Sequence, residues 1–192
     1  MTLLSTPFVF WIAVAVTMFW ALGAYNRLVR LRSDMIQTLQ SLALQWEHNA
    51  QTVRHELATL SHTQESDSIW GNHSDEASSW RPLAVAIKQF QACIASVLTK
   101  PTTAPAVDDI ASIRAAHEVM QGAWQRLNNL HEDLAGSPVP QRLVLLWQHQ
   151  SLLAQEKLRD YNTSVSSYNH AVAQFPAFLL AWVFVFKLGQ AV

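Results

Sequence analysis

Histidine is the residue type through which this chain could most readily do chemistry, since it occurs eight times in 192 residues. His48, His55 and His62 stand seven apart, a spacing that places them on one face of a helix. Neighbours in such a row lie roughly 10.5 Å apart, whereas the ligands of a shared zinc ion lie about 2 Å from the metal. The spacing therefore favours a solvated polar face. A metal-dependent enzyme or metal sensor using these histidine-rich faces is the alternative.

The other reactive side chains lack the neighbours that catalysis requires. His117 and His131 flank an apolar stripe, which favours partly buried histidines bonded to their surroundings. Cys93 is the single cysteine and has no base beside it in sequence, so we expect it to pack as a small apolar residue. The sequence contains no Gly-rich phosphate loop, no GxSxG and no paired-carboxylate motif. We therefore expect no catalytic residue, no cofactor and no resident metal.

The composition indicates a helical protein, part of which faces lipid rather than water. Half of the residues are apolar and only 14% are charged, whereas soluble domains carry about a quarter charged residues. Five Gly and seven Pro argue against a β-sandwich or barrel. The net charge of −1 lacks the basic footprint of a nucleic-acid-binding protein, so we expect no nucleic-acid partner.

An uncharged run from Pro7 to Ala24 is long enough for a membrane helix, since about 17–20 residues cross a bilayer core. Three arginines follow the run, and no Lys or Arg precedes it (Arg27, Arg30 and Arg32). The positive-inside rule then predicts a single-pass protein of the inner (plasma) membrane, with its N-terminus outside and the rest in the cytoplasm. A signal peptide cleaved near Ala21-Leu22-Gly23 is the alternative. The absence of Lys and Arg before the apolar run disfavours it, because signal peptides begin with a basic segment.

Apolar residues repeat with a helical period along most of the remaining chain. From Leu28 to Leu60 the mean step is 3.56 residues, without Gly or Pro, which predicts one unbroken helix from the membrane to about His62. Three further amphipathic helices are expected, with Pro82 in the first turn of one, an Asp108 or Asp109 cap on the next and Pro140 opening the last.

These elements predict an all-α fold in which residues 1–24 are a transmembrane anchor and residues 25–174 an antiparallel up-down-up-down four-helix bundle. The first and fourth helices are the longest, so we expect them to project toward the membrane as a two-helix stalk. Residues 175–192 form an apolar tail whose run from Phe175-Pro176 is too short to span. We expect this tail to associate with membrane lipid, with Trp182 and Lys187 at headgroup depth.

All three tyrosines occur in one pattern, Tyr-Asn-x-x-Val, near the membrane ends of the first and fourth helices. The copies begin at Tyr25-Asn26, Tyr161-Asn162 and Tyr168-Asn169. The pattern favours a packed seam in which Asn fixes the register, and a partner surface is the alternative. Because two helices alone leave apolar sides uncovered, we also predict that the stalk assembles a homo-oligomer.

These two regions resemble the LemA family. The first matches its YNxLVxLR stretch over Tyr25-Asn26-Arg27-Leu28-Val29-Arg30-Leu31-Arg32, and the second matches YNxxVxxYNxxxxxFPxxLxA from Tyr161 to Ala181, followed by Phe184-Val185-Phe186-Lys187. The resemblance covers about a quarter of the chain and implies a membrane-tethered helical bundle of poorly defined biochemical role. The family's basic cluster is replaced by Glu47-His48-Asn49, which indicates a divergent member to which that cluster's role does not carry over.

Two tryptophans stand out in or beside the polar segment 63–79, which we expect to be a loop at the distal end of the bundle. Trp70 and Trp80 either fold back on the bundle or meet a protein partner, and folding back is favoured. The sequence as a whole predicts a non-enzymatic membrane-tethered scaffold or adaptor that assembles with itself and with an unidentified protein. A membrane-interface remodelling protein acting through the tail is a further alternative.

Overall fold

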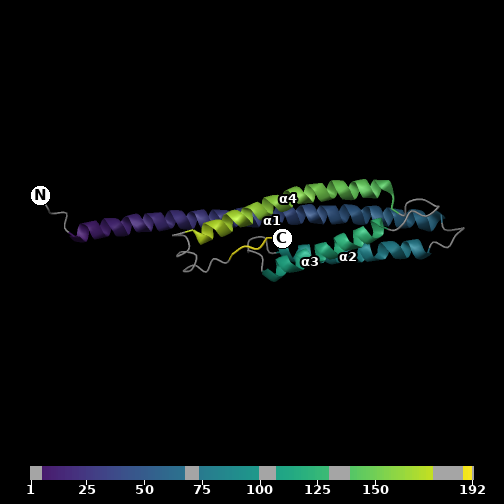
Figure 1. Ribbon diagram of the computed structural model, residues 1–192, viewed down its shortest axis with the longest axis horizontal. Coiled ribbons are helices and arrows are strands. Elements are labelled where there is room, and N and C mark those ends of the chain that lie inside the picture. The colour runs from purple at the N-terminus through teal and green to yellow at the C-terminus, as the bar shows by residue number, and fades with distance from the viewer. Residues whose placement is uncertain (1–5, 68–73, 100–106, 130–138, 175–187, 192) are drawn as a thin grey trace.

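The computed structural model describes residues 6–67, 74–99, 107–129, 139–174 and 188–191. Within these ranges the chain forms four helices and no strand: α1 (Thr6–Asp67), α2 (Ser74–Leu98), α3 (Val107–Asn128) and α4 (Gln141–Ala173). Successive helices run in opposite directions along one common axis (Figure 1). The predicted all-α, up-down-up-down bundle with long first and fourth helices is therefore confirmed.

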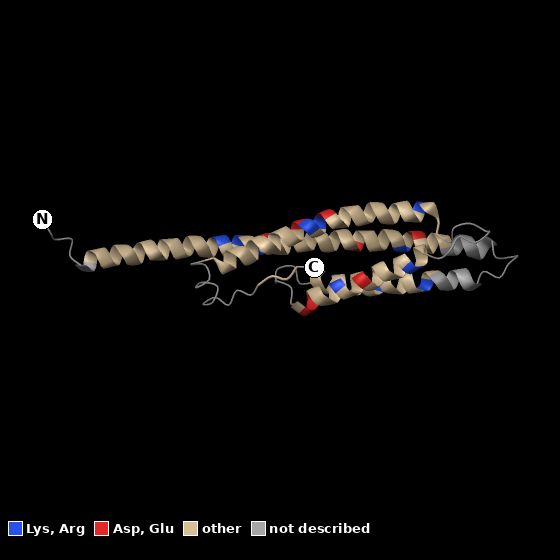
Figure 2. Ribbon diagram, in the orientation of Figure 1, with Lys and Arg blue, Asp and Glu red and all other residues tan. Residues whose placement is uncertain are grey.

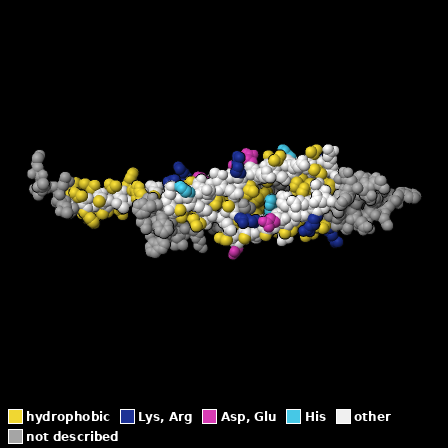
Figure 3. Space-filling view, in the orientation of Figure 1, with side chains coloured by type: hydrophobic (Ala, Val, Ile, Leu, Met, Phe, Trp, Pro, Cys, Tyr) yellow, Lys and Arg dark blue, Asp and Glu magenta, His cyan; other side chains and the backbone are white. Residues whose placement is uncertain are grey.

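The first helix is one uninterrupted element of 62 residues, about 93 Å long at 1.5 Å per residue. Its N-terminal part stands alone, and Figure 3 shows hydrophobic side chains on the visible face of this part. The most apolar eighteen-residue window has a mean hydropathy of 1.9 and is not buried by the rest of the chain. By length and composition, α1 can cross a membrane. The predicted unbroken helix from the apolar run to about His62 is confirmed.

The core lies along the C-terminal two-thirds of α1, which packs against both α2 and α4. The apolar positions expected from the helical period are buried. On α1 and α2 they include Leu28, Met35, Leu39, Leu42, Trp46, Ala50, Val53, Leu57, Leu83, Ile87, Phe90, Ile94 and Val97. Cys93 is half-buried and packs against this core, as expected for a small apolar residue.

Three helix boundaries differ from the sequence prediction. The α1 helix extends to Asp67, into the segment from residue 63 that was expected to be a loop. The α3 helix begins at Val107, so Asp108 and Asp109 lie in its first turn rather than at its cap.

The α2 helix begins at Ser74, so Pro82 lies inside it rather than in its first turn. Pro82 is exposed, so its ring faces solvent and disturbs no core packing. Proline removes a single backbone donor, and the buried positions that follow, beginning with Leu83, keep the helix in place despite that loss.

The third helix packs against α2, whereas the backbones of α3 and α4 make no close approach to each other within the described ranges. The bundle is therefore closed on three sides and open on the fourth. We call the space between α3 and α4 the open seam. A side chain of each helix meets the other across it, Trp124 of α3 and Trp147 of α4, so the seam is bridged by side chains rather than by close backbone packing.

Candidate functional site

Two tryptophans close the distal end of the open seam, which is the end farther from the N-terminus of α1. The rings of Trp124 on α3 and Trp147 on α4 stack with their centroids 4.4 Å apart and their planes 9° from parallel. Both side chains are buried. A stacked aromatic pair contributes about 0.5–1.5 kcal/mol beyond the area it buries. The pair therefore links two helices whose backbones lie too far apart for direct packing.

The proximal end of the seam is closed by the last described residues, 188–191, which we call the C-terminal strap. The Asn169 side chain pairs with the Gly189 backbone through two bonds of 2.8 Å, donating from Nδ2 to the carbonyl and accepting the N–H at Oδ1. The Tyr161 hydroxyl donates to the Gln190 carbonyl at 2.8 Å. On the opposite side Arg114 of α3 donates to the Ala191 carbonyl. The strap thus joins α4 to α3.

A glycine lets the strap approach α1 closely. A Cβ atom built on Gly189 would lie 2.6 Å from the Met35 sulfur and 3.4 Å from a Val165 methyl. Tyr161, which donates to the strap, is itself buried, and burial raises its pKa to about 12. The Tyr161 phenol is therefore protonated at physiological pH and can donate its hydrogen bond to the Gln190 carbonyl of the strap.

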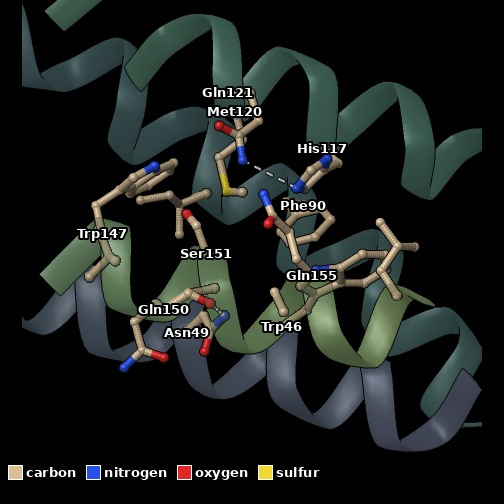
Figure 4. Close-up of a pocket in the computed structure, with 15 residues that line it drawn as sticks. Trp46, Asn49, Phe90, His117, Met120, Gln121, Trp147, Gln150, Ser151 and Gln155 are labelled. Carbon is tan, nitrogen blue, oxygen red and sulfur yellow. Dashed lines mark hydrogen bonds between the residues drawn. The ribbon is translucent and has the colours of Figure 1, made fainter. Parts of the chain in front are cut away.

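Between these two closures lies a pocket of about 190 Å³ (Figure 4). All four helices contribute to its wall. The lining residues are Trp46, Asn49, Ala50, Val53, Ile87, Phe90, His117, Met120, Gln121, Trp147, Gln150, Ser151, Ala154, Gln155 and Leu158. Figure 3 shows a hollow with hydrophobic side chains in the middle of this face and a histidine beside it. No Asp, Glu, Lys or Arg belongs to the lining set, so the pocket carries no formal charge while its histidine is neutral.

Three rings form one corner of the pocket. His117 stacks on Trp46 with centroids 5.6 Å apart and lies tilted against Phe90 at 5.5 Å. Burial lowers the pKa of His117 below its ordinary value of 6.5, against a smaller opposing effect of the Glu118 carboxylate. The imidazole is therefore neutral at pH 7.

The neutral imidazole has a defined hydrogen-bond partner. Gln121 Nε2 lies 3.3 Å from His117 Nε2. An amide nitrogen can only donate, so His117 Nε2 accepts this bond and the ring proton sits on Nδ1. The expectation of a partly buried, bonded histidine at position 117 is confirmed. In Figure 4 the polar ends of His117, Gln121 and Gln155 gather on one side of the pocket.

A short amide chain connects the α1 and α4 walls. Gln45 donates to Asn49 at 2.8 Å, and Asn49 donates in turn to the backbone carbonyl of Gln150 at 3.0 Å. The buried Gln150 Oε1 atom has no hydrogen-bond partner among the described residues. A buried acceptor left in this state costs about 1–3 kcal/mol. The wall is thus braced by polar bonds and keeps one unsatisfied acceptor.

The tyrosine motif has an intramolecular place in the structure. Tyr161 and Tyr168 are only 1% and 2% exposed, and Asn169 binds the strap. On α4, α1 and the strap cover the two tyrosines of the motif. Tyr25 is half-buried and Asn26 exposed, while Asn162 is half-buried.

Several other predicted site residues fall elsewhere. Trp80 belongs to α2 rather than to a loop, and it is half-buried against the core, as folding back on the bundle requires. His48 and His55 are exposed on α1, and the described residues contain no group of three potential metal ligands. The remaining predicted sites lie outside the residues whose side chains the structure describes: His62, Trp70, His131, Phe175, Pro176, Trp182 and Lys187.

Sequence reasoning missed both the pocket and the strap. Trp46, Met120 and Trp147 lie on the buried apolar faces of their helices, and helical periodicity identifies such a face but does not indicate that these side chains also line a pocket. The available signal was on α4, where the apolar stripe passes from Trp147 to Ala154 over the polar Ser151. The strap had no signal, because four residues show no periodicity.

Comparison with known proteins adds no identification. No family model, curated protein or solved structure matches this chain.

Proposed function

We propose that this chain is a non-enzymatic, membrane-tethered helical scaffold or adaptor of the LemA type. The observation that carries the proposal is the continuity of α1, whose exposed apolar end and buried core positions belong to one helix. An anchor that joins its bundle without a break fixes the distance and direction of the bundle relative to the bilayer. Such fixed placement suits a protein that holds partners at a membrane.

Charge along α1 supports an inner-membrane orientation with the bundle in the cytoplasm. In Figure 2 the first Lys or Arg positions on α1 follow a long stretch of helix that carries no charged residue. They are Arg27, Arg30 and Arg32. Basic residues directly beyond a membrane helix favour the cytoplasmic side.

The LemA assignment is supported by the packing of the two blocks that carry the resemblance. Arg32 in the first block lies close enough to Tyr168 in the second to oppose the rise in pKa that burial gives this tyrosine. In the second block, Tyr161 and Asn169 bind the strap. The resemblance therefore falls on residues with a shared structural task, which is to close the stalk.

Self-assembly and lipid contact are proposed for the apolar end of α1 rather than for the tyrosine motif. Its exposed large side chains are Phe8, Val9, Phe10, Trp11, Ile12, Val16, Met18, Phe19, Trp20 and Leu22. Exposed apolar surface of this extent is normally covered by lipid or by another copy. The unidentified protein partner is assigned to the distal bundle, which the anchor holds away from the bilayer.

Site-specific photo-crosslinking in native membranes tests the scaffold proposal. A photoreactive residue at the exposed Leu145 of α4 is expected to form discrete protein adducts that disappear when residues 1–24 are deleted. The same residue at the buried Leu143 is the matched control and should give none. Absence of any discrete adduct from Leu145, Leu152 and Val119, together with a stoichiometric metal in the purified protein, would favour the metal-dependent alternative instead.

A further inference from the structure

The pocket in the open seam has the properties of a ligand site, which a scaffold does not require. Along the seam it lies between the Trp124–Trp147 stack, whose Trp147 lines it, and the C-terminal strap. Both closures act through side chains or a short segment, and neither fills the space between α3 and α4. The pocket therefore results from the separation of α3 and α4, which are joined only at the two closures within the described residues.

From the lining of this pocket we infer that it binds a neutral, single-ring aromatic molecule carrying one hydrogen-bonding group. This inference goes beyond the scaffold function and does not depend on it. Three features of the pocket define the ligand: its volume, the ring character of its walls and its lack of charge.

The volume sets the size of the ligand. An enclosed apolar cavity of about 150 Å³ is enough to bind benzene, and this pocket measures about 190 Å³. The space therefore accepts one six-membered ring with a small substituent. A longer body would have to extend out of the seam into solvent.

The walls set the chemical character. Trp46, Phe90 and Trp147 supply aromatic surface, against which another ring packs offset or edge-on. Met120 adds a flexible thioether, which makes favourable contacts with ring edges. Because no lining residue carries a fixed charge, a charged ligand would lose its hydration without gaining a counter-ion.

The polar edge sets the substituent. Burial keeps His117 neutral, its Nε2 atom is bonded to Gln121, and Gln155 lies beside this pair in Figure 4. Because His117 Nε2 already accepts from Gln121, the Nδ1–H of His117 and the amide groups of Gln121 and Gln155 remain for a ligand, and a single hydroxyl or carbonyl group on the ring suits them. Ligand pockets are commonly apolar with a few such convergent polar groups.

Methionine-methyl NMR on the full chain in lipid nanodiscs tests this inference, with 4-fluorophenol as the probe. The chain has four methionines. Met120 lines the pocket, Met35 is buried beneath the strap, and Met18 is exposed on the apolar end of α1. We expect the Met120 methyl signal to shift and saturate, and Met35 to stay unchanged. Met18 should report only linear partition of the probe into lipid.

Two substitutions locate the binding. Ala154→Leu fills the pocket and should weaken 4-fluorophenol binding at least about tenfold. Ala115→Leu makes the same change at an exposed position of α3 outside the lining and should alter binding less than about twofold. His117→Phe keeps a ring in place and should weaken 4-fluorophenol about threefold to tenfold while leaving fluorobenzene unaffected.

Three results would overturn the inference. The first is a Met120 signal that moves only in proportion to Met18, which would show partition without a site; this readout needs no variant to fold. The second is an equal loss of binding in Ala154→Leu and Ala115→Leu. The third is absence of probe binding together with a changed oligomer mass in Ala154→Leu, which would mean that a second copy of the chain occupies the seam.

Discussion

Gly189 is the residue whose replacement tests the strap most directly. A Cβ atom there would lie 2.6 Å from the Met35 sulfur, so Gly189→Ala forces either a shift of Met35 or a lifting of the strap. Overpacking of this kind costs about 1–3 kcal/mol. We expect the melting temperature, followed by circular dichroism in detergent, to fall by a few degrees, since 1 kcal/mol corresponds to about 2–4 °C at this size.

Gly122→Ala is the matched control for that substitution. Gly122 lies inside α3, where an added Cβ atom would meet only the Arg126 guanidinium at 3.9 Å. Alanine is favoured over glycine in a helix interior by about 0.5–1 kcal/mol, so this variant should melt at a higher temperature. Equal behaviour of the two variants would contradict close packing of the strap on α1.

Tyr161 gives the fold a dependence on alkaline pH. Its pKa is about 12 in the folded chain against 10 ordinarily, so the folded state holds the phenolic proton more tightly. The resulting stabilisation is complete below about pH 10 and is lost as the pH rises through about 12. Tyr161→Phe should cost about 1 kcal/mol at pH 7 through the lost bond to Gln190.

The measurement is urea unfolding of both proteins between pH 7 and pH 11.5. The difference in unfolding free energy between the parent and Tyr161→Phe should shrink above about pH 10, because only the parent loses the contribution of a protonated Tyr161. A difference that stays constant across this range would show that Tyr161 titrates normally in the folded chain.

At the scale of elements, the Trp124–Trp147 stack joins α3 and α4 at the distal end of the open seam. A double-mutant cycle with Trp124→Leu and Trp147→Leu should give a coupling free energy of about 0.5–1.5 kcal/mol in chemical denaturation, because each variant alone removes the stack. Trp11→Leu combined with Trp147→Leu is the control, since Trp11 lies on the exposed end of α1, and these effects should add within about 0.5 kcal/mol. If the free-energy effects of Trp124→Leu and Trp147→Leu simply add, the two rings do not stabilise each other, and the stack does not hold α3 and α4 together.

The elements themselves were largely predictable from the sequence. The spacing of apolar residues from Leu28 to Leu57 identifies the buried face of α1, and the same period identifies α4 through Tyr161, Val165 and Tyr168. The spacing of apolar residues predicts these helices correctly because each helix buries one continuous apolar stripe. The start of α2 was missed because Pro82 was expected in a first turn, whereas the helix continues through it from Ser74.

The candidate site was not predictable in the same way. A pocket arises where two helices stand apart, and the separation of α3 and α4 depends on the size of side chains from several elements, such as Trp124 and Trp147. The strap depends on bonds between Asn169 and Gly189, a contact that no local pattern specifies. The motif Tyr168-Asn169 drew attention to buried residues of α4, for which a packed seam was the favoured interpretation, but nothing in the motif indicated that Asn169 binds the strap.

At the scale of the whole molecule, the proposed orientation places the bundle in the cytoplasm. In a Cys93→Ser background, a cysteine at the exposed Leu145 should resist a membrane-impermeant thiol reagent in intact cells and react after permeabilisation. A cysteine on the outer side, placed at Thr2, should react in intact cells. Labelling of the Leu145 position in intact cells would reverse the orientation.

The central claim is that anchor and bundle share one rigid helix, and a distance between two spin labels on α1 tests it most directly. Labels replace the exposed Phe19 and Leu44 in a Cys93→Ser background, in nanodiscs. An unbroken helix between these positions predicts a narrow distance distribution at about 38 Å, from a rise of 1.5 Å for each of the 25 steps from residue 19 to residue 44. A broad distribution, one centred well below about 30 Å, or loss of the Phe19 label through cleavage would contradict the claim.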